Sequence, residues 1–454
     1  MRRKMLSIAL LAMLALGCSA QASAKNIKID QKAFPDKVIR RELGYWDAND
    51  DGSLSPKEAK KITEMILYPN VNYKKKTIDF TGIQKLKWLK KLSISQGYRV
   101  KNLKSKFIKE MYVDQYALSG LNLKNVPNLQ KFYVEPEDES DDDAESVSYN
   151  PVKKPLRDFS CLPKLRVLHY DYDESKSVVL NVSKNRKLTE LVVGAHIREL
   201  NFNKLPNLKT LRLSNMEGDC LDVSMLNKLT SLTYETPKNQ LILPVQSVLN
   251  SLRVSSVQGV DVSGQSELSV LQMEGGTLKS DLAQNQKLEM LFLENVQVEK
   301  KLDLSNKTLL KEVKLSWISN QTIALQQSGE LQELSIDHAA GLTLQMPQSE
   351  TFKKLWLEET NISEIDLTGC PNVEEIVLEV RGVEDVMPKI LTKTLTGLKK
   401  VTLQGNSSNA SSAAYVLDSF NIADADKLES LYIVDMPNYT VNLNWFPNLR
   451  YTNL

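Results

Sequence analysis

One short pattern of apolar residues repeats along most of this chain. Between Glu199 and Asn215 it reads L-x-x-L-x-L, with Leu208, Leu211 and Leu213 at the apolar places. The steps between successive copies are 19 to 22 residues. The middle residues of ten successive copies are Leu191, Leu211, Leu232, Leu252, Leu271, Leu291, Val313, Leu334, Leu355 and Ile376. A period held this evenly predicts a repeat architecture in which each copy is one turn of a coil.

Looser copies extend the array in both directions, to about 17 units in all. Upstream, the middle residues are Leu92, Met111, Phe132 and Leu168, and downstream they are Val401, Leu431 and Thr452. Two longer gaps, near residues 135–155 and 404–427, predict insertions between turns.

The alternation within L-x-L predicts a short strand that turns both apolar residues inward and the middle residue outward. Each turn leaves apolar edges that only neighbouring turns can cover, so the strands should stack into one curved parallel sheet. A second alternating patch, about eight residues earlier, predicts an extended segment on the opposite side of the coil. Examples are Leu200–Phe202, Leu221–Val223, Val260–Val262, Leu302–Leu304 and Ile365–Leu367.

These repeats, over residues 81–454, resemble the leucine-rich repeat surface proteins of bacteria, the internalin-like and BspA-like group. The resemblance implies an α/β solenoid of about 17 units of 20–22 residues, preceded by a small helical cap. It says little about function, because such scaffolds bind many different ligands.

The first 24 residues have the features of a secretory signal. Arg2, Arg3 and Lys4 precede a short apolar run, which is too short to span a bilayer as a helix. Two cleavage routes remain open: lipidation at Cys18, within a lipobox-like sequence, or cleavage after Ala24. The first predicts an outer-membrane or cell-surface lipoprotein, held to the membrane by its N-terminal lipid only, and the second a secreted or periplasmic protein.

Residues 47–58 (DANDDGSLSPKE) match the calcium-binding loop of an EF-hand, with Gly52 at its sharp turn. We expect one structural Ca²⁺ site within a helical cap over residues 25–80. The alternative is an Asp- and Asn-rich turn that holds no metal. The predicted ligands are Asp47, Asn49, Asp51, Ser53, Ser55 and Glu58.

Outward positions of the predicted sheet form columns, because equivalent residues of successive turns lie side by side. The candidate ligand-binding residues of the central column are Phe292, Trp356, Tyr432, Arg212 and Arg253. Aromatic and arginine side chains dominate binding hot spots, although isolated surface aromatics are also ordinary.

The next column is acidic, and the run Glu135–Glu145 in the first insertion is acidic as well. The column could attract a cationic partner or metal ions, but a solvated rim of carboxylates needs no partner. Its members are Asp114, Glu135, Asp171, Glu235, Glu274, Glu294, Asp337, Glu358 and Glu379.

Catalysis finds little support in the sequence. The three histidines, His169, His196 and His338, lie in no recognisable nucleophile or zinc motif, and 58 basic against 56 acidic residues imply no nucleic-acid partner. After the signal, Cys161, Cys220 and Cys370 are expected to be buried apolar residues.

We therefore predict a non-enzymatic, monomeric binding or adhesion protein, at the cell surface or secreted. It would recognise a protein or glycan through the concave face of the sheet. The alternative is a structural envelope lipoprotein in which the solenoid is a spacer or assembly component.

Overall fold

The computed structural model describes residues 25–67, 76–94, 98–118, 120–135, 157–171, 177–235, 240–245, 247–380, 388–392, 395, 397–405, 427–434 and 446–452. The predicted signal with Cys18, nearly all of the acidic run and most of the two expected insertions lie outside these residues. The chain divides into two compact units: unit 1 comprises residues 1–156 and 161–165, and unit 2 comprises residues 157–160 and 166–454.

Unit 1 begins with two helices around a small antiparallel pair of strands. Strand β1 (Ile27–Lys28) pairs with β2 (Ser53–Leu54). Helix α2 (Lys37–Gly44) follows β1 in the chain, and helix α3 (Pro56–Lys61) follows β2. Helix α3 begins with a capping box, in which the side chains of Ser55 and Glu58 and their backbone N–H groups bond reciprocally. The helix ends at Lys61, so Ile66 lies beyond it.

Ile66 lies instead in β3 (Glu64–Leu67), the first strand of a parallel ladder in unit 1. This strand pairs with β5 (Lys91–Ile94), which pairs with β7 (Glu110–Asp114), which pairs with β8 (Lys131–Glu135). On the other side of these turns, β4 (Lys76–Asp79) pairs with β6 (Tyr98–Lys101). Short helical segments connect them: η1 (Ile83–Lys85), α4 (Gln115–Leu118) and η2 (Leu123–Asn125).

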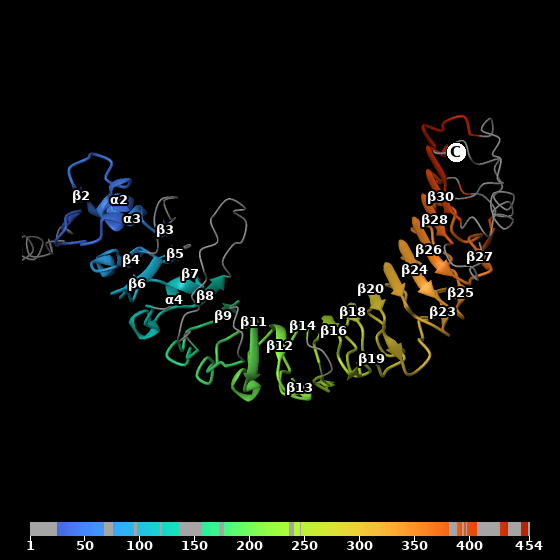
Figure 1. Ribbon diagram of the computed structural model, residues 1–454, viewed down its shortest axis with the longest axis horizontal. Helices are drawn as coiled ribbons and strands as arrows, with labels where there is room; N and C mark the ends of the chain where they lie inside the picture. Colours follow the sequence, from blue (N-terminus) through green and yellow to red (C-terminus); the bar gives the residue numbers. More distant parts are fainter. Residues whose placement is uncertain are drawn as a thin grey trace, which may run out of the picture. The chain divides into compact units, whose positions relative to one another are not determined.

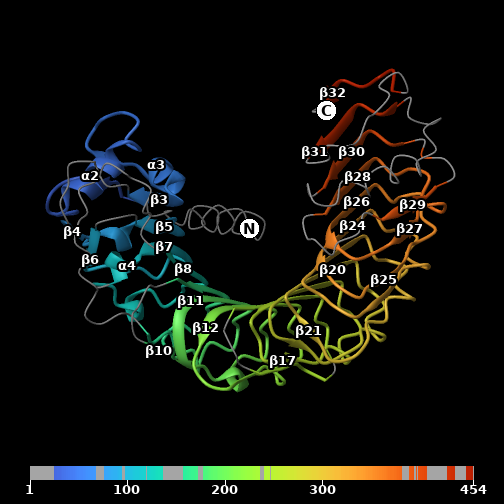
Figure 2. The same cartoon turned by 45° about the vertical axis from the view of Figure 1, so that its right-hand side comes forward.

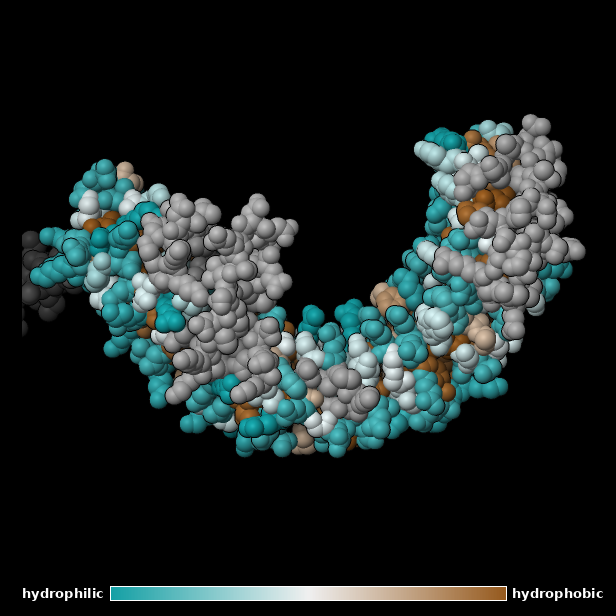
Figure 3. Space-filling model, in the orientation of Figure 1, coloured by the Kyte–Doolittle hydropathy of each residue, from teal (hydrophilic) through white to brown (hydrophobic). Residues whose placement is uncertain are grey.

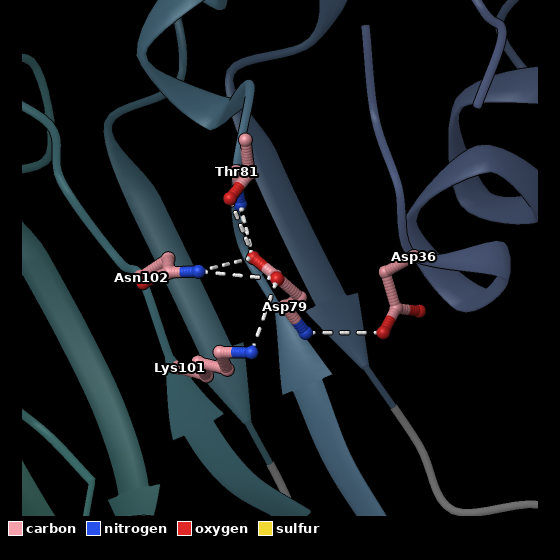
Figure 4. Close-up of polar contacts among 5 residues, drawn as sticks. All are labelled: Asp36, Asp79, Thr81, Lys101 and Asn102. Carbon is pink, nitrogen blue, oxygen red and sulfur yellow. Dashed lines mark hydrogen bonds and ion pairs between the residues drawn. The ribbon is translucent and has the colours of Figure 1, made fainter. Parts of the chain in front are cut away.

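A pair of aspartates connects the helices of unit 1 to its first parallel turn (Figure 4). Asp36 caps α2 through the N–H of Val38, and its other oxygen accepts the N–H of Asp79 at 3.0 Å. The Asp79 carboxylate in turn accepts hydrogen bonds from Thr81 and from the side-chain amide of Asn102. Burial works to raise the pKa of Asp79, but these hydrogen bonds and Lys101 outweigh it and the pKa is lowered.

Unit 2 is a solenoid of 14 turns whose long strands form one curved parallel sheet (Figures 1 and 2). The ten middle residues from Leu191 to Ile376 all lie in consecutive strands of this ladder, as predicted, and all ten are fully buried. The strands, in spatial order, are β9 (Val167–Tyr170), β11 (Glu190–Glu199), β12 (Thr210–Met216), β14 (Ser231–Glu235), β16 (Ser251–Ser255), β18 (Val270–Glu274), β20 (Met290–Glu294), β22 (Glu312–Ser316), β24 (Glu333–Ala339), β26 (Lys354–Thr360), β28 (Glu375–Glu379), β30 (Lys400–Gln404), β31 (Ser430–Val434) and β32 (Tyr451–Thr452). The short strand β10 (Val178–Val179) pairs with the end of β11.

Shorter strands line the opposite side of unit 2, where the sequence predicts extended segments (Figure 1). Three of the five predicted patches contain strand residues, whereas Phe202 begins the turn η3 (Phe202–Lys204) and Leu302–Leu304 form no regular element. The described residues of unit 2 form no α-helix. The strands are β13 (Cys220–Asp222), β15 (Gln240–Ile242), β17 (Gly259–Val260), β19 (Thr277–Leu278) and β21 (Gln297–Val298) in one sheet, β23 (Thr322–Ala324) with β25 (Thr343–Gln345), and β27 (Glu364–Asp366) with β29 (Lys389–Leu391).

An aspartate shapes the corner after many of these short segments. Its Oδ1 accepts the backbone N–H two residues later, as in Asp261 to Ser263 at 2.9 Å and Asp303 to Ser305 at 3.1 Å. This Asx turn satisfies a backbone donor where the chain leaves the extended segment. The hydrogen bond from the Ser263 N–H lowers the pKa of Asp261, and those from Ser305 lower the pKa of Asp303, against the opposing effect of burial.

In several turns of unit 2 a buried polar side chain lies inside the coil, three residues before the repeat motif. Asn285 donates to the carbonyls of Val262 and Gln265 in the preceding turn, and the Cys370 thiol donates to Pro347 at 3.2 Å. Lys307 occupies the same position in its turn and is fully buried. Burial lowers its pKa, although Asp303 and Asp281 oppose the shift.

The cysteines only partly follow the expectation of burial. Cys370 is buried inside the coil, but Cys161 is half-buried and Cys220 is exposed at the start of β13. Cys220 faces outward because the apolar places of that strand are taken by its neighbour Leu221 and by Val223.

Candidate functional site

The outward central column of unit 2 has the register that the sequence predicts. Arg212 pairs with Thr233 and then Arg253, Gln272 with Phe292, Ser335 with Trp356, and Thr402 with Tyr432. The proposed binding residues therefore lie on one face of one sheet. The full central column is His169, Val192, Arg212, Thr233, Arg253, Gln272, Phe292, Lys314, Ser335, Trp356, Val377, Thr402 and Tyr432.

Two aromatic rings of the central column already carry a cation from their own chain. The ammonium of Lys314 lies 5.2 Å from the centre of the Phe292 ring, and that of Lys354 lies 5.4 Å from the centre of the Trp356 ring. Both rings and Tyr432 are half-buried. The lysines hold the rings of Phe292 and Trp356 by cation–π contact, and they leave less ring surface for a ligand.

A hollow of about 600 Å³ opens beside Arg253 on strands β14, β16 and β18. The neighbouring Arg212 forms an ion pair with Glu235 at 3.7 Å, but the side chain of Arg253 makes no hydrogen bond or ion pair with any described residue. An exposed guanidinium without a partner offers five N–H donors to a ligand. The hollow is lined by Thr233, Glu235, Arg253, Val254, Ser255, Ser256, Gln272 and Glu274.

The predicted acidic column forms one edge of this face, which we call the acidic edge: Glu235, Glu274, Glu294, Asp337, Glu358 and Glu379. Register places these side chains, with Ser255 and Ser316 between some of them, in one row. Asp114 was expected to belong to the exposed column, but that expectation is wrong. It is buried in unit 1, where it accepts the N–H of Ala117 at the start of α4.

Directly beyond the acidic edge, six consecutive turns place a residue in the left-handed backbone region. These residues are Ser256, Gly275, Asn295, Trp317, His338 and Glu359, with φ between +47° and +67°. Glycine adopts this conformation freely, and asparagine and histidine are enriched in it, whereas a bulky residue such as Trp317 is an outlier there. Trp317 is nevertheless 56% exposed, and its ring stacks on that of His338 with centroids 4.1 Å apart.

Trp317 was not predicted as a functional residue, although the sequence carries a signal for it. Aligned on the repeat, its neighbours are turn-forming residues of small or polar type, so a tryptophan at this position departs from the pattern. The repeat motif of this turn ends two residues earlier, at Leu315, so its pattern makes no prediction for the position of Trp317.

Unit 1 carries an aromatic pair on its own ladder. The rings of Tyr112 and Tyr133 stack with centroids 4.3 Å apart, and Lys91 lies 4.9 Å from the Tyr112 ring. The Tyr112 hydroxyl donates to Glu110 at 2.9 Å. Burial, aided by that carboxylate, raises the pKa of Tyr112 well above its usual range.

The predicted calcium loop has the backbone that such a loop needs. Gly52 takes φ +74°, and the Asp47 carboxylate accepts the N–H groups of Gly52 and Asp51. Glu58 is turned into the loop, where its two oxygens accept the N–H groups of Ala48 and Ser55 at 3.0 and 2.8 Å. The Ser55 hydrogen bonds lower the pKa of Glu58.

The oxygen-rich composition of this loop fits calcium, a hard cation that takes carboxylate, amide and carbonyl oxygens. In the described geometry, however, the carboxylates of Asp47, Asp51 and Glu58 face backbone donors. No group of three or more His, Cys, Asp or Glu among the described residues is drawn together as a metal cluster. Ion binding would have to gather these oxygens around one point.

The chain resembles solved leucine-rich repeat proteins of bacteria in fold. The functional domain of InlJ from Listeria monocytogenes, which includes a cysteine ladder, is 18% identical with a TM-score of 0.50; the match covers 90% of this chain and 82% of that one. A leucine-rich repeat protein of Leptospira interrogans is 14% identical with a TM-score of 0.52, over 87% and 98% of the two chains. The chain is thus a leucine-rich repeat solenoid.

No protein-family model matches the sequence, and no curated relative matches it either. Among the described residues, no helix is long and apolar enough to cross a membrane.

Proposed function

We propose that this solenoid is a non-enzymatic binding protein, secreted or at the cell surface, that holds a protein partner on the outward face of the long sheet of unit 2. A glycan partner is the alternative ligand for the same face. The observation that carries the proposal is the central column, because its register brings two arginines and three aromatic side chains onto one face.

Chemistry of the central column supports a binding role. The side chain of Arg253 is exposed beside the hollow and has no partner among the described residues, while Phe292 and Trp356 are held in place by lysines. Preorganised aromatic anchors near an arginine are the usual centre of a protein-binding hot spot. Hydrophilic residues predominate on the described surface that Figure 3 shows, and polar residues also make up the rim of a typical interface.

Capture of surface proteins by an immobilised chain of residues 25–454, which lacks both cleavage sites, tests this proposal. The test variant is Arg253→Ala with Phe292→Ala. The matched control is Ile242→Ala with Val248→Ala, because both side chains are exposed and lie outside the central column. We expect the test variant to lose at least tenfold in affinity for whichever protein the wild type retains, while the control keeps it. Equal retention by both variants would overturn the proposal.

We also propose that the chain is exported and attached by a lipid at Cys18. The lipobox-like position of Cys18 after the apolar run supports this, and the competing Ala22–Ala24 site would give a free protein. Mass spectrometry of the native N-terminus separates the two, because only the first route leaves a diacylglyceryl-modified cysteine as the first residue.

Finally, we propose that residues 47–58 bind one structural calcium ion, through Asp47, Asn49, Asp51, Glu58, the backbone carbonyl of Ser53 and a water held by Ser55. The left-handed Gly52 and the inward Glu58 support this assignment. The role is structural because the loop lies between α2 and α3, and β2 within it pairs with β1.

A further inference from the structure

We propose that Trp317 is a docking platform for a cationic side chain, lysine or arginine, in a basic segment of the partner protein. This rests on the proposed function and deepens it, since it names the chemistry that the partner must present at one edge of the sheet.

Trp317 combines a strained backbone with high exposure to solvent. Its left-handed backbone, at φ +57°, costs a residue with a side chain about 1–2 kcal/mol. The residue is also 56% exposed, so more than half of its surface stays in contact with water. Strain of this kind at an exposed aromatic residue points to a role in binding.

The platform is held rigidly from beneath. The His338 ring stacks on the indole at 17° between planes, and each nitrogen of that ring meets a carboxylate: Nδ1 meets Asp337, and Nε2 meets Glu359 at 2.8 Å. Asp337 is fixed in turn by the Ser316 hydroxyl at 2.9 Å. With the imidazole clamped on both sides, one face of the indole is covered and fixed while the side chain remains exposed.

The exposed part of Trp317 has no lysine or arginine over it. Phe292 and Trp356 each have a lysine over the ring, but no lysine or arginine lies over Trp317 in the described part of the chain. The side chain thus has room for the contact that its neighbours in the sheet already make with their own lysines.

The charges around Trp317 favour a cation. Glu294 pairs in register with Ser316 and is exposed, and its carboxylate has no partner among the described residues. The six members of the acidic edge are all carboxylates, and the register positions between them are serines. A lysine or arginine on the indole would gain both cation–π contact and the attraction of Glu294 and its neighbours.

Fluorine NMR of the same chain of residues 25–454, labelled with 5-fluorotryptophan, tests the proposal. The chain has five tryptophans, and the Trp317 signal is assigned by Trp317→Phe. We expect hexa-arginine to shift this signal while that of Trp88 in unit 1 stays in place. Hexa-citrulline, which has the same shape without the charge, should shift neither signal.

Affinity for hexa-arginine should weaken about fivefold in Trp317→Ala, the size of a cation–π contact at a partly exposed site. Glu294→Gln should weaken it as well, and Tyr451→Ala, an exposed aromatic on the last strand, should not. Equal affinity in wild type and Trp317→Ala would show attraction by the acidic edge alone and overturn the proposal. A shift of the Trp317 signal with cellohexaose but not with hexa-arginine would overturn it in favour of a glycan.

Failure here is distinguishable from failure of the proposed function. If Arg253→Ala with Phe292→Ala loses the captured protein while hexa-arginine leaves Trp317 unmoved, only the cationic assignment is wrong.

Discussion

The carboxylate of Asp36 accepts hydrogen bonds from two segments of unit 1, the N–H of Val38 at the start of α2 and the N–H of Asp79, 43 residues further on. One side chain therefore caps the first long helix and fixes it to the first parallel turn (Figure 4). Helix α2 is thus joined to the first parallel turn by a hydrogen bond of its own capping residue.

Asp36→Ala should destabilise the helical end of unit 1 by about 2 kcal/mol, because it removes a helix cap and a second hydrogen bond of about 1 kcal/mol each. Hydrogen–deuterium exchange should speed up in residues 37–44 and 76–80. The control is Asp30→Ala, which removes only a local, exposed bond to Ala33. Equal effects of the two variants would show that the contact with Asp79 contributes nothing.

Calcium should stabilise the same end of the protein. At a concentration 100 times the dissociation constant, binding to the folded state alone adds about 2.7 kcal/mol. Terbium in place of calcium should luminesce when Trp46, adjacent to the loop, is excited. Glu58→Gln should abolish the luminescence while keeping an oxygen for the capping box. No luminescence from the wild type would mean that the loop is a metal-free turn.

The Asx corners should make the solenoid sensitive to acid. The pKa values of Asp261 and Asp303 are lowered in the folded state. Their contribution is therefore complete above the unfolded pKa, about 3.9, and is lost as the pH falls through the folded values. Asn201 forms the same corner with Asn203 at 3.1 Å, so Asp261→Asn with Asp303→Asn should keep the turn. Thermal melts between pH 7 and pH 2 should fall less steeply for this variant than for wild type.

Lys307 should reduce stability at neutral pH. Its folded pKa is lowered by burial, so the charged form is disfavoured in the core and stability should rise as the pH increases through the folded value toward the unfolded one. Lys307→Met keeps the length without the charge and should stabilise the protein by about 1–2 kcal/mol at pH 7. The advantage should shrink by pH 10. A destabilised variant would show instead that the hydrogen bond to Ala283 outweighs burial of the charge.

Trp317→Asn should raise the melting temperature, because asparagine adopts a left-handed backbone readily and Asn295 already does so one turn earlier. The expected gain is about 1 kcal/mol. Trp317→Ala retains most of the backbone strain and is the control. Destabilisation by Trp317→Asn would show that the indole stabilises the fold, and it would remove the main argument for a binding role.

The repeat period was enough to predict the long sheet. Each inward apolar residue, such as Leu211, packs against the equivalent residue of the next turn, and only the neighbouring turns can cover its apolar surface. The same register predicted the central column from Arg212 to Tyr432. The Asx turns after the short extended segments were not predicted. Asp261 and Asp303 accept hydrogen bonds from the backbone two residues later, and no periodic apolar pattern marks such local contacts. The Trp317–His338 stack was missed for a different reason: it depends on a left-handed backbone beyond the motif, which only the neighbouring Ser256, Gly275 and Asn295 indicate.

The most direct test of the central claim is site-specific photocrosslinking on the producing cell. A benzoylphenylalanine placed at Gln272, in the central column beside Arg253, reports on the long sheet, and one placed at Gln297, exposed on β21, reports on the opposite side. The account predicts a discrete crosslinked protein from position 272 and none from position 297. No product from position 272, or the same product from both, would contradict it.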